Sequence, residues 1–173
     1  MSTDMAEETA ATTGGKLGEL YVRHAGAGLR LAYFLTGERG QAEDLLHDAF
    51  IRVVGRYQDM RVPDAFDAYL RRAIVNLHMS QLRRRKVERA YLVREAARAA
   101  DVYEPPDVGA RADLWNALGS LTYRQRAVVV LRFYEDLTEQ ATADVMRCSV
   151  AAVNSLVARA METLRDTIGS EER

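Results

Sequence analysis

Apolar residues recur at intervals of three and four along almost the whole chain, and this spacing limits the fold more than any other feature of the sequence. A repeat of that length places apolar side chains on one face of an α-helix, whereas strands need an alternation of two. The broadest such face is formed by Leu45, Leu46, Ala49, Phe50, Val53, Val54 and Tyr57. Strand patterns are almost absent. The sequence therefore predicts an all-α protein.

A proline-rich break divides the helical pattern. Pro105 and Pro106, in the stretch ADVYEPPDVGA, cannot both lie inside a helix, and the apolar repeat lapses there. A chain of 173 residues is long enough for two small domains on either side of such a break. The predicted organisation is a disordered tail over 1–15, a helical domain over 16–98, a flexible linker over 99–111, a second helical domain over 112–168 and a short tail over 169–173.

Cysteine, histidine and apolar content exclude several classes of protein. Cys148 is the only cysteine, which rules out an internal disulfide and fits a reducing cytosol. His24, His47 and His78 have no metal-ligand spacing, so neither a metal nor a cofactor is expected. No apolar run approaches the ~20 residues of a membrane helix, and the N-terminus lacks the features of a secretory signal. We expect a cytoplasmic protein without membrane insertion.

Positive charge is concentrated in residues 69–98, which hold nine Arg or Lys against two Glu in a chain of net charge −1. Such a block attracts an anionic partner, or it is simply a solvated helix face. Tyr69 lies just before the first of these arginines, and Asn76 and His78 lie between Arg72 and Arg83. This mixture suits single-stranded or distorted DNA, because cations follow phosphates, an aromatic ring stacks on a base and an amide reads a base edge.

Two carboxylates, Asp44 and Asp48 in AEDLLHDAFIRVV (42–54), lie four residues apart on one face of a predicted helix. Paired carboxylates occur in acid–base catalysis, but this segment has no neighbouring nucleophile, metal triad or glycine-rich phosphate loop. We therefore expect no enzymatic activity. Two interpretations remain for this face, namely ordinary solvation and protein binding.

The segment LTEQATADVMRCSVAAVNSLVARAM (137–161) predicts a helix-turn-helix. Thr138 is suited to cap a short first helix, and Arg147-Cys148-Ser149 forms the turn into a longer second helix. In DNA-binding proteins the second helix of this unit lies in the major groove. The alternative is an αα-hairpin that only closes a small bundle.

The outward positions of that second helix are poor in positive charge. They are Ala151, Ala152, Asn154, Ser155, Ala158 and Arg159. Asn can read adenine, and Ala or Ser can contact a thymine methyl, so base contact is possible. Phosphate contacts are few, because each needs a cation. Leu156 is expected to be either a core residue or an apolar contact for a partner protein.

In order along residues 17–168, these segments resemble the extracytoplasmic-function (group 4) sigma factors of bacterial RNA polymerase. AEDLLHDAFIRVV is similar to the region 2.2 helix of that family, which docks on the clamp helices of the β′ subunit. The resemblance implies core-polymerase contacts by Asp44, His47, Asp48, Ile51 and Arg52. YLRRAIVNLHMSQLRRR resembles regions 2.3 and 2.4, with the loop around Pro63 to Phe66 near a captured base. It implies −10 element contacts by Tyr69, Arg72, Asn76, Arg83, Arg84 and Arg85.

The segment from Leu118 to Ser149 resembles region 4 of the same family, which reads the −35 element. By that match the −35 contacts are Arg147, Ser149, Ala151, Ala152, Asn154, Ser155 and Arg159. The resemblance implies as partners core polymerase, through the β′ clamp helices and the β flap, promoter DNA and an anti-sigma factor.

Several positions depart from the family pattern. Members typically continue after CSV with Gly-Thr-Val-Lys-Ser-Arg, so the usual Lys is Asn154 here and the usual Arg is Leu156. Arg147 replaces a turn glycine, Thr142 replaces an apolar residue, and a frequent Gln is His47. We expect a −35 contact that is weak, altered or replaced by a protein contact. The alternatives are a sigma-like interaction protein and a stand-alone helix-turn-helix regulator, of which the second leaves the N-terminal motifs unexplained.

Overall fold

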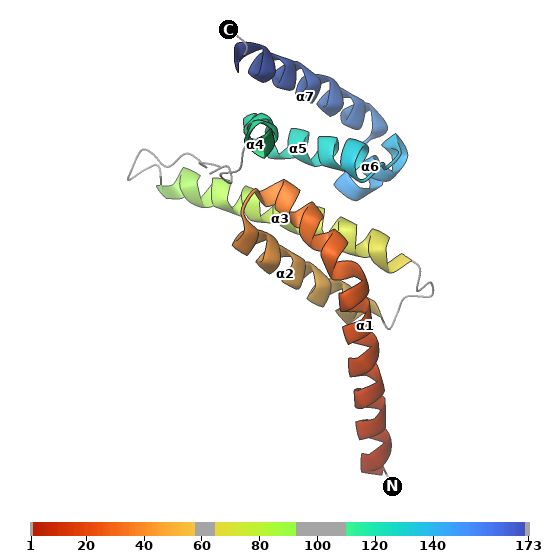
Figure 1. The fold of residues 1–173 in the computed structure, drawn as a ribbon. Coiled ribbons are helices and arrows are strands. Elements are labelled where there is room, and N and C mark those ends of the chain that lie inside the picture. The colour runs from red at the N-terminus through yellow and green to blue at the C-terminus, as the bar shows by residue number, and fades with distance from the viewer. Residues whose placement is uncertain (1, 58–64, 93–109, 172–173) are drawn as a thin grey trace.

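The computed structural model describes residues 2–57, 65–92 and 110–171, and the regular structure in these ranges is entirely helical (Figure 1). The prediction of an all-α fold is confirmed. The elements are α1 (Ser2–Thr36), α2 (Arg39–Tyr57), α3 (Phe66–Leu92), α4 (Ala110–Ser120), α5 (Tyr123–Val129), a π-helical turn (Val130–Tyr134), α6 (Glu139–Met146) and α7 (Val150–Glu171).

Helices extend into both segments for which the sequence predicts tails. Helix α1 begins at Ser2, inside the tail expected over 1–15, and α7 continues to Glu171, inside the tail expected over 169–173. Neither helical end contains proline, and the N-terminal segment holds Ala, Met and Glu, which are good helix formers. Residues 99–109 of the predicted linker lie outside the described ranges, and α4 already begins at Ala110.

Helices α1, α2 and α3 pack around one apolar core. The turn between α1 and α2 uses Gly37 at a φ of 75°, and the Glu38 carboxylate accepts hydrogen bonds from the N–H groups of Gln41 and Gly40 at the start of α2. These bonds lower the pKa of Glu38. Phe66 at the start of α3 is fully buried in the core. The geometry fixes the direction in which α2 leaves α1.

Helices α4 to α7 form the second half. Thr122 and Gln125 make a capping box at the start of α5. The π-helical turn then shifts the chain by one residue, with Glu135 N–H donating to the Val130 carbonyl at 2.9 Å. Val153 and Ala160 of α7 are fully buried against the other helices.

The two halves pack directly against each other, with α4, α5 and α6 lying between α7 and α3 (Figure 1). A single buried cluster contains residues of both halves. Trp115 of α4 contacts the rings of Tyr33 and Phe34 in α1, at centroid distances of 4.7 and 5.4 Å. The Arg126 guanidinium donates to the Leu35 carbonyl at 3.1 Å. The sequence predicts two small domains joined by a tether and does not predict this interface, in which aromatic side chains of both halves pack together.

Candidate functional site

One face of α2 exposes the acidic pair singled out in the sequence. Asp44, His47 and Asp48 are exposed, as is Arg52, and Ile51 retains 56% of its accessible surface. Their spacing of three and four residues places them side by side on the helix. The opposite face of α2 is buried against α1 and α3. The five residues predicted to bind polymerase therefore form one accessible strip with an apolar residue among charged ones.

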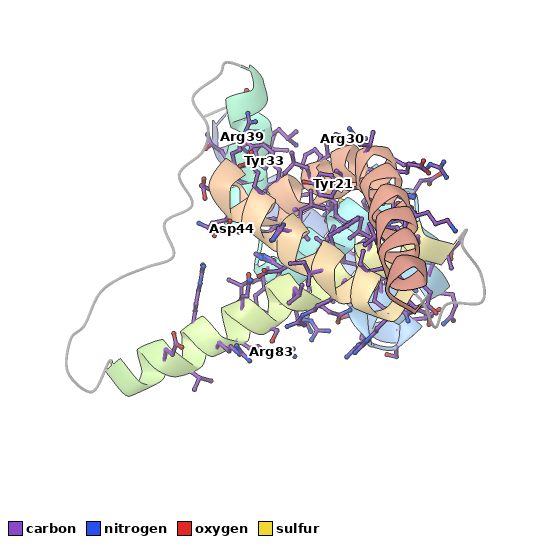
Figure 2. The ribbon with its side chains drawn as sticks, turned by 90° about the horizontal axis from the view of Figure 1, so that it is seen from below. Tyr21, Arg30, Tyr33, Arg39, Asp44 and Arg83 are labelled. Atoms are coloured by element: carbon purple, nitrogen blue, oxygen red, sulfur yellow. The ribbon has the colours of Figure 1, made fainter. Side chains whose placement is uncertain are left out.

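The basic end of α3 stands free of the packed helices. Arg83, Arg84, Arg85 and Lys86 are all exposed. Figure 2 shows this half of α3 projecting beyond the other helices, with Arg83 near the start of the projection. The arrangement leaves these cations available to a polyanion.

The first half of α3 exposes Tyr69 and Arg72, whereas the Asn76 side chain is already hydrogen-bonded. Tyr69 is 47% exposed and Arg72 is exposed. The Asn76 amide is half-buried; its Nδ2 donates to the Arg72 carbonyl at 2.7 Å and, across the interface, to the Val145 carbonyl of α6 at 3.1 Å. The three predicted −10 residues thus lie on one side of α3, and the amide among them already has partners.

His78 does not belong to that exposed group, although the sequence placed it there. It is 8% exposed and faces the core. Desolvation, with the positive charges of Arg126 and Arg85, lowers the pKa of His78 to about 4. The imidazole is therefore neutral near pH 7 and serves packing. Pro63 and Asp64, near the predicted base-capturing loop, lie outside the described residues, while Phe66 is buried.

Helices α6 and α7 form the predicted helix-turn-helix. Thr138 caps α6 by accepting a hydrogen bond from the Ala141 N–H at 3.1 Å. Ser149 caps α7 in the same way, accepting from the Ala152 N–H at 3.1 Å. Arg147, between the helices, has φ 53° and ψ 52°, the left-handed conformation usually held by glycine. The predicted Thr138 cap and the Arg147 turn are confirmed.

Thr142 is the one polar residue fully buried inside this unit among the described residues. Its Oγ1 has no hydrogen-bond partner in the described part of the chain. A buried hydroxyl without a partner costs about 1–3 kcal/mol. The left-handed conformation of Arg147 adds about 1–2 kcal/mol of strain. Both departures weaken the helix-turn-helix without changing its form.

The start of α7 offers a nearly neutral outer surface. The predicted contact residues there are exposed, apart from half-buried Ala152; they are Ala151, Ala152, Asn154, Ser155 and Arg159. Asn154 Nδ2 donates to Glu139 Oε2 of α6 at 3.2 Å. Leu156 is half-buried and packs against the apolar core, which accounts for a leucine at this position.

Comparisons with known proteins assign each half of the chain to a known protein family. The family described as Sigma-70 region 2 matches residues 20–88, and the family described as Sigma-70, region 4 matches residues 111–164. The RNA polymerase sigma-E factor of Streptomyces avermitilis is 35% identical over 156 residues, covering 89% of this chain and 86% of that protein.

This chain is a sigma factor of the extracytoplasmic-function group.

Other relatives agree with that assignment. The ECF RNA polymerase sigma factor SigE of Mycolicibacterium smegmatis is 34% identical over 86% of this chain and 60% of that protein. The solved structure of the sigma factor RpoE from Bartonella quintana, in complex with the anti-sigma factor NepR, has the same fold with a TM-score of 0.69, at 20% identity over 89% of this chain and 97% of that one. The protein directs transcription initiation by RNA polymerase, binds DNA and is not an enzyme. No described helix is long and apolar enough to cross a membrane.

Regions 2 and 4 of this sigma factor are joined by an ion pair that sequence inspection did not find. Arg71 of α3 donates through Nε to Glu135 Oε2 at 2.7 Å and through Nη2 to Asp67 Oδ2 at 2.7 Å. The Arg71 and Glu135 side chains are only 19% and 14% exposed. Glu135 follows the π-helical turn directly. Because Arg71 and Glu135 are 64 positions apart in the sequence, no local sequence pattern predicts that they form an ion pair.

A cleft between the two regions is lined by residues predicted for three different contacts, with polymerase, the −10 element and the −35 element. It has a volume of about 970 Å³ and lies between α2, α3, α5 and the turn after α6. Its lining includes the predicted polymerase residue Arg52, the predicted −10 residues Tyr69, Arg72, Asn76 and Arg83, and the predicted −35 residue Arg147. The other −35 candidates, on α7 and at Ser149, do not line it.

Proposed function

We propose that this sigma factor binds core polymerase through the exposed strip of α2. The observation that carries the proposal is the accessibility of Asp44, His47, Asp48 and Ile51 together, within the segment that matches region 2. An apolar residue surrounded by charges suits a protein interface, in which the apolar side chain is buried and the charges set orientation. The proposed partner surfaces are the β′ clamp helices for region 2 and the β flap for region 4.

For the −10 element, the proposal assigns phosphate contacts to Arg72 and to Arg83, Arg84 and Arg85, stacking to Tyr69 and base reading to Asn76. Exposure of the arginines and of Tyr69 supports this. The amide of Asn76 is held by Val145. Base reading therefore requires that region 4 move away from α3, so the arrangement described above is the closed form of the proposed function.

For the −35 element, α7 enters the major groove with Asn154, Ser155 and Arg159 outward, assisted by Ala151, Ala152, Ser149 and Arg147. The exposure of these residues supports the assignment. Only Arg147 and Arg159 among them are cations, so few counterions are released on binding and −35 affinity is low.

An anti-sigma factor and a cytoplasmic location complete the proposal. The likeness to a sigma factor solved with its anti-sigma factor supports such a partner. Its surface on this chain follows from the function itself, because a regulator that covers the strip of α2 blocks polymerase binding.

A second candidate function is a sigma-like protein that occupies polymerase without reading the −35 element. The hydrogen bond between Asn154 and Glu139 favours it, because the one outward amide of α7 already has a partner.

Run-off transcription with core polymerase, this protein and a pool of genomic promoter fragments tests both. Start sites that share −10 and −35 motifs support the main proposal. Start sites that share only a −10 motif support the second candidate. Tight polymerase binding without transcripts contradicts the proposed promoter function.

A further inference from the structure

The cleft between regions 2 and 4 is lined by arginines from both regions, and we refer to it as the arginine cleft. The six are Arg52, Arg56, Arg72, Arg83, Arg124 and Arg147. The first four belong to region 2 and the last two to region 4. No Asp or Glu of the described residues lines the cleft.

Among the described residues, these arginines have no carboxylate partner that would balance their charge. Within the described ranges none of the six is in an ion pair with a carboxylate. By contrast Arg71, on the other side of α3, is paired with both Asp67 and Glu135. Like charges that face one space repel each other, and the low-dielectric walls of a cleft strengthen their field. An anion bound in the arginine cleft offsets this repulsion.

The chemistry of the lining identifies the class of anion. Guanidinium groups donate paired hydrogen bonds that match phosphate oxygens. Tyr69 and Tyr123 supply aromatic rings, and Ser80 adds a hydroxyl. Aromatic rings stack on nucleobases with little sequence preference. A volume of about 970 Å³ is at the upper end of ordinary small-molecule sites, which span roughly 300–1,000 Å³.

We propose that the arginine cleft binds a small phosphorylated anion of nucleotide size, which bridges regions 2 and 4. A promoter strand is a poorer occupant of the closed form, because the base-reading amide of Asn76 is already bound to Val145 there.

A bridging ligand has a thermodynamic consequence. It contacts Arg124 and Arg147 together with the region 2 arginines only when the two regions are closed. A ligand that binds one state better shifts the equilibrium toward that state. The anion therefore holds region 4 over Asn76 and opposes −10 reading. This consequence rests on the proposed function, whereas the binding itself does not.

Binding is tested with the full chain alone, without polymerase or DNA. Calorimetric titrations with ATP, tripolyphosphate and inorganic phosphate compare ligands of different size and charge. We expect one equivalent of ATP or tripolyphosphate to bind at least about tenfold more tightly than inorganic phosphate, since only the longer anions reach both sets of arginines. Trp115, the only tryptophan of the chain, packs on α1 across the interface and reports closure by reduced quenching with acrylamide. If neither ATP nor tripolyphosphate binds, the proposal is overturned. The result of the run-off experiment does not depend on this outcome.

Variants in region 4 decide whether the ligand bridges. Arg124→Ala and Arg147→Gly should each weaken tripolyphosphate binding about tenfold, as expected for loss of a charge-assisted contact. Glycine suits the left-handed conformation at position 147, so Arg147→Gly keeps the turn folded. Arg23→Ala, at an exposed position of α1 away from the cleft, is the matched control and should bind normally. Undiminished binding by both region 4 variants overturns the bridging role.

Discussion

Regions 2 and 4 keep the same kind of helical scaffold but differ in how their functional faces are charged. The basic end of α3 exposes four consecutive cations, Arg83 to Lys86, whereas the outer face of α7 near its start exposes only Arg159. Region 2 also exposes the α2 strip proposed to bind polymerase, while region 4 carries a strained Arg147 and a buried hydroxyl at Thr142 that has no partner among the described residues. We therefore expect promoter affinity in this sigma factor to come mainly from region 2.

Charge reversal on α2 has the largest expected effect on this comparison. Asp48→Arg should weaken core-polymerase binding at least about 1,000-fold, or about 4 kcal/mol, because it removes a carboxylate of the proposed interface and introduces repulsion. Co-purification and fluorescence titration with core polymerase measure the change. The matched control Asp113→Arg makes the same substitution on the exposed surface of α4. Equal affinity of the Asp48 variant and the parent protein would remove α2 from the interface.

Acid should destabilise region 2 through His78. Its pKa falls from 6.5 to about 4 on folding, so the unfolded chain binds the proton more readily. The contribution of His78 to the free energy of unfolding is therefore fully present above pH 6.5 and is lost as the pH falls toward 4. At 1.36 kcal/mol per pKa unit, the loss is about 3 kcal/mol. Urea unfolding between pH 7 and pH 4 should show this loss in the parent chain. His78→Leu should flatten that part of the profile, and an unchanged slope would locate the effect elsewhere.

Glu135→Gln should loosen the contact between the regions. The substitution removes one of the two carboxylate charges beside the half-buried Arg71 guanidinium and leaves only a neutral amide oxygen in its place, at a cost of about 1–3 kcal/mol. Quenching of Trp115 fluorescence should increase as region 4 separates. Glu162→Gln, at an exposed position of α7, is the control. If the Glu135 variant quenches like the parent chain, the ion pair does not hold the regions together.

The smallest expected effect comes from adding one positive charge to α7, which reduces the difference in charge between the functional faces of regions 2 and 4. Asn154→Lys places a cation on the outer face of α7, so −35 duplex affinity should rise a few-fold and its salt dependence should steepen by about 0.9 in log–log slope. Fluorescence anisotropy at several salt concentrations measures both, with Asn116→Lys on α4 as the control. A slope that stays the same would mean that α7 does not enter the groove.

Local features of the fold could be predicted from the sequence, because they depend on nearby residues. The Thr138 cap, the turn at Arg147 and the buried face of α7 with Val153 and Ala160 all follow from helical spacing and capping chemistry. The helical end of α1 was missed, since a polar segment without an apolar face resembles a disordered tail. His78 was misjudged because three- and four-residue spacing does not tell which face of α3 a second half will cover.

The candidate site could be predicted only as separate sets of residues. The polymerase set lies on α2, the −10 set on α3, and the −35 set on α7 and the turn before it, and the family resemblance supplies the partners. The arginine cleft, the Arg71–Glu135 pair and the engagement of Asn76 join residues far apart in the chain. Such contacts depend on how regions 2 and 4 pack against each other, and the spacing of apolar residues along the sequence does not predict that packing.

The hydrogen bond between Asn76 and Val145 also caps the C-terminal end of α6. Val145 is the next-to-last residue of that helix, where carbonyl groups have no partner within the helix. Asn76 therefore acts as a C-terminal cap supplied from another helix. If region 4 leaves α3, as the proposed −10 reading by Asn76 requires, the Asn76 amide and the end of α6 lose this bond in the same event. In the proposed open state α6 therefore loses one cap, and water takes the place of Asn76 on the Val145 carbonyl.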